Sequence, residues 1–275
     1  MAAFVAGAWY LWGVRAVRRR GGQWPWLRTL AFFALGLGSY LVVECGFLSV
    51  YSVELRYAFT TRIALLIFVV PGLIALGRPL ELALAAGGER TTGRIARVLR
   101  WRIIRLFGNA MFATLFMASV FLLFLTPIAG LLRDTPWIGA TLGIVVPLLG
   151  LVMVVPLTAL AGAHSALFLT VEFLLAFVEL VIDSIPGLLM RLSESILDGA
   201  PAVSSSASWW PSPLHDQHLA GDLLWFIAEV VDVPVLVILL IRWMRTDRSE
   251  AARYDDLSDD EHERLVQEHL RGERS

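Results

Sequence analysis

Long apolar segments, separated by short groups of arginines, make up most of the chain. The apolar segments cover residues 2–14, 29–50, 57–80, 104–132, 136–160, 164–189 and 218–242. All but the first reach the length of about 20 residues with which a helix crosses the hydrocarbon core of a bilayer. The first is short for a span, which local thinning of the bilayer accommodates. The pattern predicts an all-α, polytopic membrane bundle of about seven transmembrane helices.

The composition agrees with a chain that lies mainly in lipid. Hydrophobic residues make up 57% of it and charged residues 17%, whereas charged residues are about 25% of an ordinary soluble domain. These values exclude a soluble enzyme, a secreted disulfide scaffold and a nucleic-acid-binding protein, and the bilayer is the first expected partner. The net charge of −1 indicates no particular partner. The single cysteine, Cys45, rules out an intrachain disulfide.

The basic residues, all of them arginine, predict the orientation of the bundle. Residues 15–28, 78–105 and 242–274 hold five, seven and seven of the 23 arginines. Because cytoplasmic loops carry the excess of basic residues, seven spans with the N-terminus outside place all three groups in the cytoplasm. We therefore expect a multi-pass protein of the cell membrane. The expected domains are a transmembrane bundle (1–243) with an outer loop (191–217), and a charged cytoplasmic tail (244–275).

Two ionisable residues are predicted at similar depth in neighbouring segments. Glu44 lies in the second apolar segment and Arg62 in the third, each about six residues below the predicted outer surface. An isolated charge in lipid is costly. We therefore expect Arg62 to pair with Glu44, or failing that with Asp222 or Asp183, in a mainly structural role.

The last two apolar segments each carry an acidic stripe. The stripes consist of Glu172, Glu179 and Asp183 in the sixth segment and of Asp222, Glu229 and Asp232 in the seventh. Spacings of three, four and seven residues place these carboxyl groups on one face of each helix. Since the acids outnumber the basic residues at comparable depth, some must be protonated, hydrogen-bonded or exposed to water. They form either interhelical hydrogen bonds between neutral carboxyls or a polar cavity for a proton, a cation or a partner helix.

Candidate metal ligands are few. Residue types that bind copper occur on the predicted outer side at Cys45, His215 and His218, and the two histidines share a face if the last helix begins near them. Two imidazoles without a third ligand are a weak pattern, and we expect no cofactor. The motifs HExxH and GxSxG, the P-loop and the Rossmann fingerprint are absent from the sequence. An enzyme is therefore not expected.

Two stretches of the chain resemble the CtaG-type cytochrome c oxidase assembly factors, which are polytopic bacterial membrane proteins implicated in copper delivery to the oxidase. The first covers residues 9–86 and includes YLWGVRAVRRRGGQWPWLRTLAFFALGL and VVPGLIALGRPLELAL. The second covers residues 208–251 and includes SWWPSPLHDQHLAGDLLWFIAEVVDVP. The residues that match the family pattern are Trp24, Pro25, Pro71, Gly77, Pro79, Asp216, Gln217, Gly221, Trp225 and Glu229. The resemblance implies a helical bundle in the bacterial cytoplasmic membrane.

The resemblance fails at the family's histidines. The family carries two histidines four residues apart in its third helix, on one face as a metal site requires, and here these positions are Phe59 and Ile63. The family's histidines in the fifth and sixth helices have no counterpart within those segments of this chain. Phenylalanine and isoleucine cannot bind copper, and the adjacent cation of Arg62 opposes metal binding. The scaffold is thus retained without the metal ligands that the resemblance implies.

Three functions remain open at this point. The first is a non-enzymatic protein of cytochrome c oxidase biogenesis, acting as an assembly factor or a stably bound accessory subunit without the family's copper site. Its expected partners are subunits of cytochrome c oxidase or of a respiratory supercomplex. The second is a copper- or cation-handling membrane protein or transporter that uses Cys45, His215, His218 and the acids within the membrane. The third is a membrane enzyme, which no nucleophile–base pair supports.

Overall fold

The computed structural model describes residues 1–88, 91–93, 95, 97, 101–102, 106, 110–159, 166–199 and 207–255. All regular structure within these ranges is helical, so the predicted all-α class is confirmed. The α-helices are α1 (Ala2–Arg19), α2 (Trp26–Leu30), α3 (Gly38–Cys45), α4 (Phe47–Val50), α5 (Arg56–Ala64), α6 (Val70–Leu76), α7 (Pro79–Ala86), α10 (Ala110–Leu122), α11 (Pro127–Asp134), α12 (Pro136–Ala159), α13 (Ala166–Leu192) and α14 (Pro213–Asp255). Segments η1 (Ala31–Leu37) and η2 (Leu65–Val69) are π-helical, and η3 (Leu123–Leu125) is a 3₁₀ turn.

Five helical stretches are long and apolar enough to cross a membrane. They are Trp26–Val50, Arg56–Leu76, Trp137–Val154, Leu169–Leu192 and Pro213–Arg248. A sixth span results if the bent pair Leu115–Leu125 and Pro127–Asp134 crosses as one unit. Helix α1 is not in this group, since its 18 residues include three arginines near its end. The count of seven spans and the orientation of the termini stay predictions.

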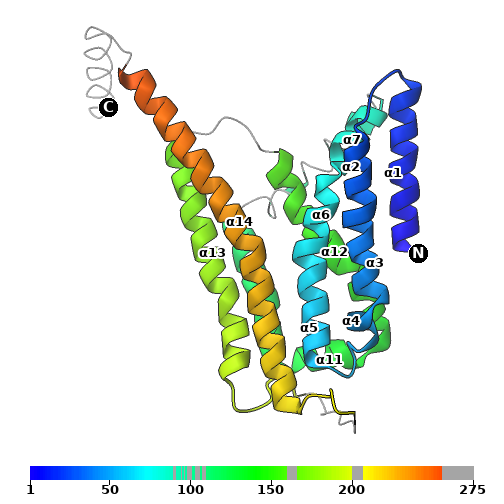
Figure 1. Cartoon of the computed structure of the whole chain (residues 1–275), viewed down its shortest axis with the longest axis vertical. Coiled ribbons are helices and arrows are strands. Elements are labelled where there is room, and N and C mark those ends of the chain that lie inside the picture. The colour runs from blue at the N-terminus through cyan, green and yellow to red at the C-terminus, as the bar shows by residue number, and fades with distance from the viewer. Residues whose placement is uncertain are drawn as a thin grey trace.

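The fourth apolar segment is broken rather than continuous. Leu115–Leu125 and Pro127–Asp134 meet at 81°, and Thr126 between them is extended, with φ −119° and ψ 158°. A residue that precedes proline is biased away from the helical region, and Pro127 then opens α11 at a position that proline favours. As a result, α11 lies across one end of the bundle, at the bottom of Figure 1. We call this the α11 end.

The helices form a main body and a long hairpin (Figure 1). Helices α1 to α7 and α12 make the body, in which α6 packs against η1 and α12 packs against η2 and α6. The hairpin of α13 and α14 leans away from the body and meets it through α5 at the α11 end. The C-terminal ends of α1 and α14, and α7, all lie at the opposite end in Figure 1. The described arginines at the C-terminal ends of α1 and α14 and at the start of α7 therefore lie on one side of the molecule.

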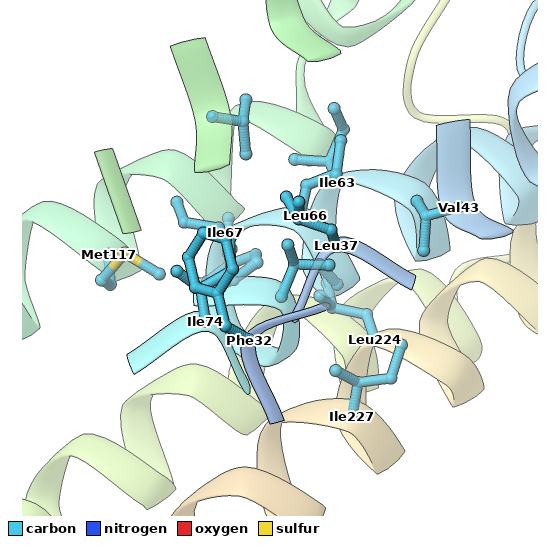
Figure 2. Packing of buried hydrophobic residues seen from close by; sticks show 14 of the residues in the cluster. Phe32, Leu37, Val43, Ile63, Leu66, Ile67, Ile74, Met117, Leu224 and Ile227 are labelled. Atoms are coloured by element: carbon cyan, nitrogen blue, oxygen red, sulfur yellow. The ribbon is translucent and has the colours of Figure 1, made fainter. Parts of the chain in front are cut away.

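The buried apolar core extends from the first helices of the body to the hairpin. Figure 2 shows Ile63, Leu66 and Ile67 of the α5–η2 segment packed with side chains from neighbouring helices. Leu224 of α14 belongs to the same cluster. Large apolar side chains on the lipid-facing surfaces are exposed instead, such as Phe226, at 63%. A membrane helix has this distribution because lipid is as apolar as its core.

Glycine lets the backbones approach closely at two helix crossings. A Cβ on Gly221 of α14 would lie 2.5 Å from the carbonyl oxygen of Gly187 on α13, so only glycine fits there. A Cβ on Gly150 of α12 would lie 2.3 Å from the carbonyl oxygen of Ile67. Pro71 has no N–H to donate to that carbonyl four residues earlier, and the preceding turn is π-helical. Such small residues at interfaces are the usual means of helix packing in membranes.

Helix α14 is longer than the apolar segment that predicts it. It begins at Pro213 and continues to Asp255, beyond residue 243 where the tail was expected to start. Proline suits a first helical turn, and residues 244–255 contain no glycine or proline that would end the helix. Asp216 and Gln217 thus belong to a helix and not to the outer loop. Residues 256–275 of the predicted tail lie outside the described residues.

Candidate functional site

The structure brings together Arg62 of α5 and Glu44 of α3, the pair that the sequence predicts. Arg62 Nε donates to Glu44 Oε1 at 2.8 Å, and Arg62 Nη2 donates to Glu44 Oε2 at 2.9 Å. The Arg62 side chain is only 4% exposed and that of Glu44 16%. A two-point contact of this kind is the strongest geometry for an arginine and a carboxylate. The pair therefore joins two spans at the α11 end.

Helix α12 is shaped to accept this ion pair. The carbonyl oxygen of Gly139 accepts a further hydrogen bond from Arg62 Nη2 at 2.9 Å. One turn later, a Cβ on Gly143 would lie 2.4 Å from Glu44 Oε2 and 3.1 Å from Arg62 Nη2. Glycine at position 143 thus leaves the space that the two charged groups occupy, and the pair connects three elements.

Asp216 of α14 caps the start of α5 from another helix. Its Oδ2 accepts from the backbone N–H of Arg56 at 2.8 Å, and its Oδ1 accepts from that of Tyr57 at 3.0 Å. The first N–H groups of a helix have no partner within it, and a carboxylate there is also favoured by the helix dipole. Asp216 is 2% exposed. It therefore fixes the α13–α14 hairpin to the body of the bundle.

Two buried arginines share a second carboxylate beside this cap. Asp198, which follows α13, lies 2.9 Å from Arg56 Nη2 and 3.1 Å from Arg133 Nη1. The three side chains are 4%, 2% and 9% exposed for Arg56, Arg133 and Asp198. Arg133 comes from α11, so the bend at Thr126 is what carries it to this place. The cluster ties together α5, α11, α14 and the segment after α13.

Gln217 and His218 hold the segment between α13 and α14. Gln217 Oε1 accepts from the backbone N–H of Leu197 at 2.8 Å, and Gln217 Nε2 donates to the carbonyl of Ser195 at 2.9 Å. His218 Nε2 lies 3.0 Å from the carbonyl oxygen of Ser193, and its Nδ1 lies 3.1 Å from Arg191 Nη1. Both ring nitrogens of His218 are thus engaged within the protein.

A polar cavity of ≈ 320 Å³ opens beside the two charged clusters. Its lining combines charged and hydroxyl side chains with apolar ones. The lining residues are Glu44, Ser49, Ser52, Val53, Phe59, Arg62, Leu132, Arg133, Gly139 and Ala140. They belong to α3, α4, α5, α11, α12 and the turn before α5, all at the α11 end. We take this polar cavity and the charged clusters around it as the candidate functional site.

The acidic stripes are only partly matched by basic residues. Asp222 lies 3.2 Å from Arg191 Nε, so it pairs with that arginine and not with Arg62. Glu229 accepts a hydrogen bond from Trp225 Nε1 four residues earlier. Both members of each of these pairs therefore lie in the α13–α14 hairpin.

Asp183 differs from the other acids. It is 1% exposed, and within the described residues neither of its carboxylate oxygens has a hydrogen-bond partner. The same holds for Oδ2 of Asp232. Glu179 makes contacts within the chain, and the side chain of Glu172 lies outside the described part of the structure. Among the described acids of the two stripes, Asp183 is thus the one with both carboxylate oxygens buried and without a hydrogen-bond partner.

The three candidate copper ligands are not gathered into one cluster. Cys45 is exposed at the end of α3, and His215 is exposed at the start of α14. His218 lies one turn after His215 on the same helix but bonds to Arg191 and Ser193. Within the described residues, no three His, Cys, Asp or Glu side chains are placed to hold a metal ion.

The chain matches the family of the cytochrome c oxidase caa3 assembly factor, CtaG, over residues 8–246. This range includes every residue of the polar cavity and both charged clusters. The chain belongs to this assembly-factor family. The resemblance seen in the sequence is thus confirmed, and the main biochemical role that the family indicates is the assembly of cytochrome c oxidase.

Curated relatives are longer than this chain. Uncharacterized proteins of Mycobacterium bovis and Mycobacterium tuberculosis are each 26% identical over 277 residues, covering 94% of this chain and 41% of the relative. An uncharacterized protein of Mycobacterium leprae is 24% identical over 266 residues, covering 94% and 40%. The chain spans about two-fifths of the length of these relatives. No solved structure matches it.

Several residues that match the family pattern lie together at the arginine-rich end. Trp24 Nε1 donates to Tyr10 Oη at 3.1 Å, and Tyr10 Oη donates to the carbonyl of Gly77 at 2.8 Å. A Cβ on Gly77 would lie 2.6 Å from the Cβ of Phe32, which stacks on Tyr10. Pro25 and Pro79 stand at the starts of α2 and α7. These motif residues of the assembly-factor family therefore pack the first helices together.

Sequence reasoning missed the second charged cluster. Arg56, Arg133 and Asp198 are not among the residues that the sequence singles out. Arg56 and Asp198 are 142 residues apart in the chain, and no local pattern joins them. One signal was present, since Pro127 within an apolar segment predicts a break that can redirect Arg133.

Proposed function

We propose that this member of the CtaG family supports cytochrome c oxidase assembly as a non-enzymatic membrane protein, without binding copper at the positions of the family's histidines. It acts as an assembly factor or a stably bound accessory subunit in the bacterial cytoplasmic membrane. Its partners would be subunits of the oxidase or of a respiratory supercomplex. The observation that carries the proposal is the position of Phe59, which lines the polar cavity together with Arg62 and Arg133.

The chemistry of that cavity supports the proposal. Phe59 and Ile63 are each 4% exposed and belong to the apolar core, and neither side chain has a lone pair to offer a metal. Two guanidinium groups line the same cavity, and fixed positive charges raise the cost of a cation there. The helical frame around these positions depends instead on ion pairs between spans.

Affinity purification of the tagged protein in a mild detergent tests the partner. Oxidase or cytochrome bc subunits at near-equal amounts would identify an accessory subunit, and substoichiometric oxidase subunits would identify a transient assembly factor. Deletion of the gene should lower oxidase activity and the haem absorbance of the membranes. Unchanged spectra and activity in the deletion strain would rule out the proposal.

Metal analysis tests the absence of the copper site. The parent protein should bind no copper after incubation with Cu⁺ and removal of excess metal. The double variant Phe59→His/Ile63→His restores the family's pair, and the variant Val53→His is its control on another wall of the cavity. Stoichiometric copper in the parent protein would contradict the proposal.

A cation-handling role is the alternative, and the unpartnered carboxylate of Asp183 favours it. In this case Asp183→Asn should abolish cation uptake into proteoliposomes, whereas Asp222→Asn, on the exposed Arg191 pair, should not. No uptake by the parent protein would remove the alternative.

A further inference from the structure

The polar cavity keeps hydrogen-bond donors that its own acids do not use. Arg62 donates hydrogen bonds from Nε and Nη2 to Glu44, and from Nη2 to the carbonyl oxygen of Gly139. Its Nη1 makes no hydrogen bond within the described residues, although Arg62 lines the cavity. A guanidinium has five N–H groups, so two of them remain available to a ligand.

Arg133, which also lines the cavity, has further N–H groups without a hydrogen-bond partner. Its side chain is 2% exposed, and its contacts to Asp198 and Asp134 are ion pairs at 3.1 Å and 3.7 Å. Its Nε and Nη1 have no hydrogen-bond partner within the described part of the chain. A buried polar group without a partner is costly, so such a group commonly marks the place of a ligand or an ordered water.

The acids of the site leave this surplus of donors in place. Glu44 is the one carboxylate among the lining residues, and Arg62 occupies both of its oxygens. Asp198 forms ion pairs with both Arg56 and Arg133. Asp134 is 45% exposed, where water screens its charge. The lining residues thus offer unused N–H donors of two arginines, together with the hydroxyl groups of Ser49 and Ser52.

We propose that the polar cavity binds a phosphate group, with Arg62 and Arg133 as its donors. The group is carried by the headgroup of a phospholipid from the leaflet at the α11 end, or by a free phosphate compound. Arginine suits this role because its planar fork binds two phosphate oxygens at once.

The size and walls of the cavity fit a headgroup with part of its glycerol. A volume of ≈ 320 Å³ is at the lower end of the range for ligand sites, which begins at about 300 Å³. Val53, Phe59 and Leu132 give it apolar walls beside the arginines. Val50 and Leu131, on the adjoining α4 and α11, are each 67% exposed, as lipid-facing side chains are.

Thermal unfolding of the delipidated full-length protein in detergent tests the proposal. Dioleoylphosphatidylglycerol should raise the unfolding temperature in a saturable manner, because a ligand that binds only the folded state stabilises it. Dioleoylglycerol, which has the same chains without phosphate, should not. Inorganic phosphate that reproduces the full shift would identify a free phosphate compound as the source. A shift with the phospholipid alone would identify the headgroup.

Two variants locate the site. Ala140→Leu fills the cavity while leaving both arginines, and Arg133→Gln removes one donor. Each should raise the half-saturating phospholipid concentration about ten-fold or more: Arg133→Gln because a charged hydrogen bond is lost, and Ala140→Leu because the larger side chain occupies the space of the headgroup. Ala34→Leu, at an exposed position of η1 outside the cavity, is the matched control and should bind as the parent does.

Three results would overturn the proposal. They are an equal shift with dioleoylglycerol, no shift with either phosphate source, or unchanged binding in Ala140→Leu. If a variant does not fold, native mass spectrometry of the parent protein decides the question. It should retain phosphatidylglycerol and not dioleoylglycerol, and equal loss of both lipids would contradict the proposal.

Discussion

At the α11 end, each buried carboxylate lies against an arginine, whereas the α13–α14 hairpin buries a carboxylate with no such partner. Glu44, Asp198 and Asp216 all lie within 3.9 Å of a guanidinium nitrogen. In the hairpin, Asp183 is equally buried, and its oxygens have no hydrogen-bond partner among the described residues. Burial favours the neutral form of an acid, whereas a neighbouring guanidinium favours its ionised form.

The comparison indicates two ways of joining membrane helices in one chain. The α11 end uses directional ion pairs, in which each partner is needed to offset the desolvation of the other. The hairpin uses the close contact of Gly187 with Gly221, and it buries Asp183 without a hydrogen-bond partner among the described residues. Changes of charge should therefore be severe at the α11 end and mild in the hairpin, and changes of volume should be severe in the hairpin.

Arg62→Ala should have the largest effect. It leaves Glu44 buried without its counter-charge, which costs about 3–5 kcal/mol of the free energy of unfolding. SDS titration of the protein in mixed micelles would measure this loss. Arg78→Ala is the control, because its pair with Glu81 is about half exposed and should contribute less than about 1 kcal/mol.

A second substitution separates the pair from other effects of Arg62→Ala. Adding Glu44→Gln removes the stranded charge, so the double variant should recover part of the lost stability. A double variant no more stable than Arg62→Ala would mean that the Glu44–Arg62 contact does not account for the loss.

Asp216→Ala should have the next largest effect, a loss of about 2 kcal/mol in the free energy of unfolding. It removes the acceptor of the first two N–H groups of α5, and both the capping and the charged hydrogen bonds are lost. Asp216→Asn keeps one acceptor oxygen and should lose about half as much. Unfolding in the same micelles measures both. Equal losses for Ala and Asn would show that the charge, and not the cap, is what matters.

The difference between the two regions also decides what the sequence could predict. Spans follow from hydropathy, a local property, so the all-α bundle was predictable. The Glu44–Arg62 pair was predictable as well, since both residues lie at the same depth in neighbouring spans. The Arg56–Asp198–Arg133 cluster was not, because it depends on the 81° bend that brings α11 across the end of the bundle.

The same reasoning explains what was predictable about the motif residues. Gly221 and Asp216 stood out as matches to the family pattern, but their roles depend on contacts with Gly187 and with the start of α5. A spacing within one helix does not contain such information. The acidic stripe of α14 was predicted as one face, yet two of its acids have partners within the hairpin and Oδ2 of Asp232 has none within the described residues.

Gly221→Ala should destabilise the hairpin by about 1–3 kcal/mol. The added methyl group would lie 2.5 Å from the carbonyl oxygen of Gly187, so the two helices must move apart. Gly72→Ala is the matched control, because nothing lies within 4 Å of its Cβ position and alanine favours a helix. If both variants unfold alike, close packing at this crossing is not what holds the hairpin.

Asp183→Asn should have the smallest effect, within about 1 kcal/mol of the parent protein. If Asp183 is already neutral, an amide of nearly the same shape removes no charge and breaks no ion pair. The paired counterpart is Asp198→Asn, which removes the charge shared by Arg56 and Arg133 and should cost about 1.5–3 kcal/mol. Measuring both by SDS titration compares the two regions directly. A loss for Asp183→Asn as large as that for Asp198→Asn would show that Asp183 is ionised, and an ionised carboxylate there would require a bound cation to offset its charge.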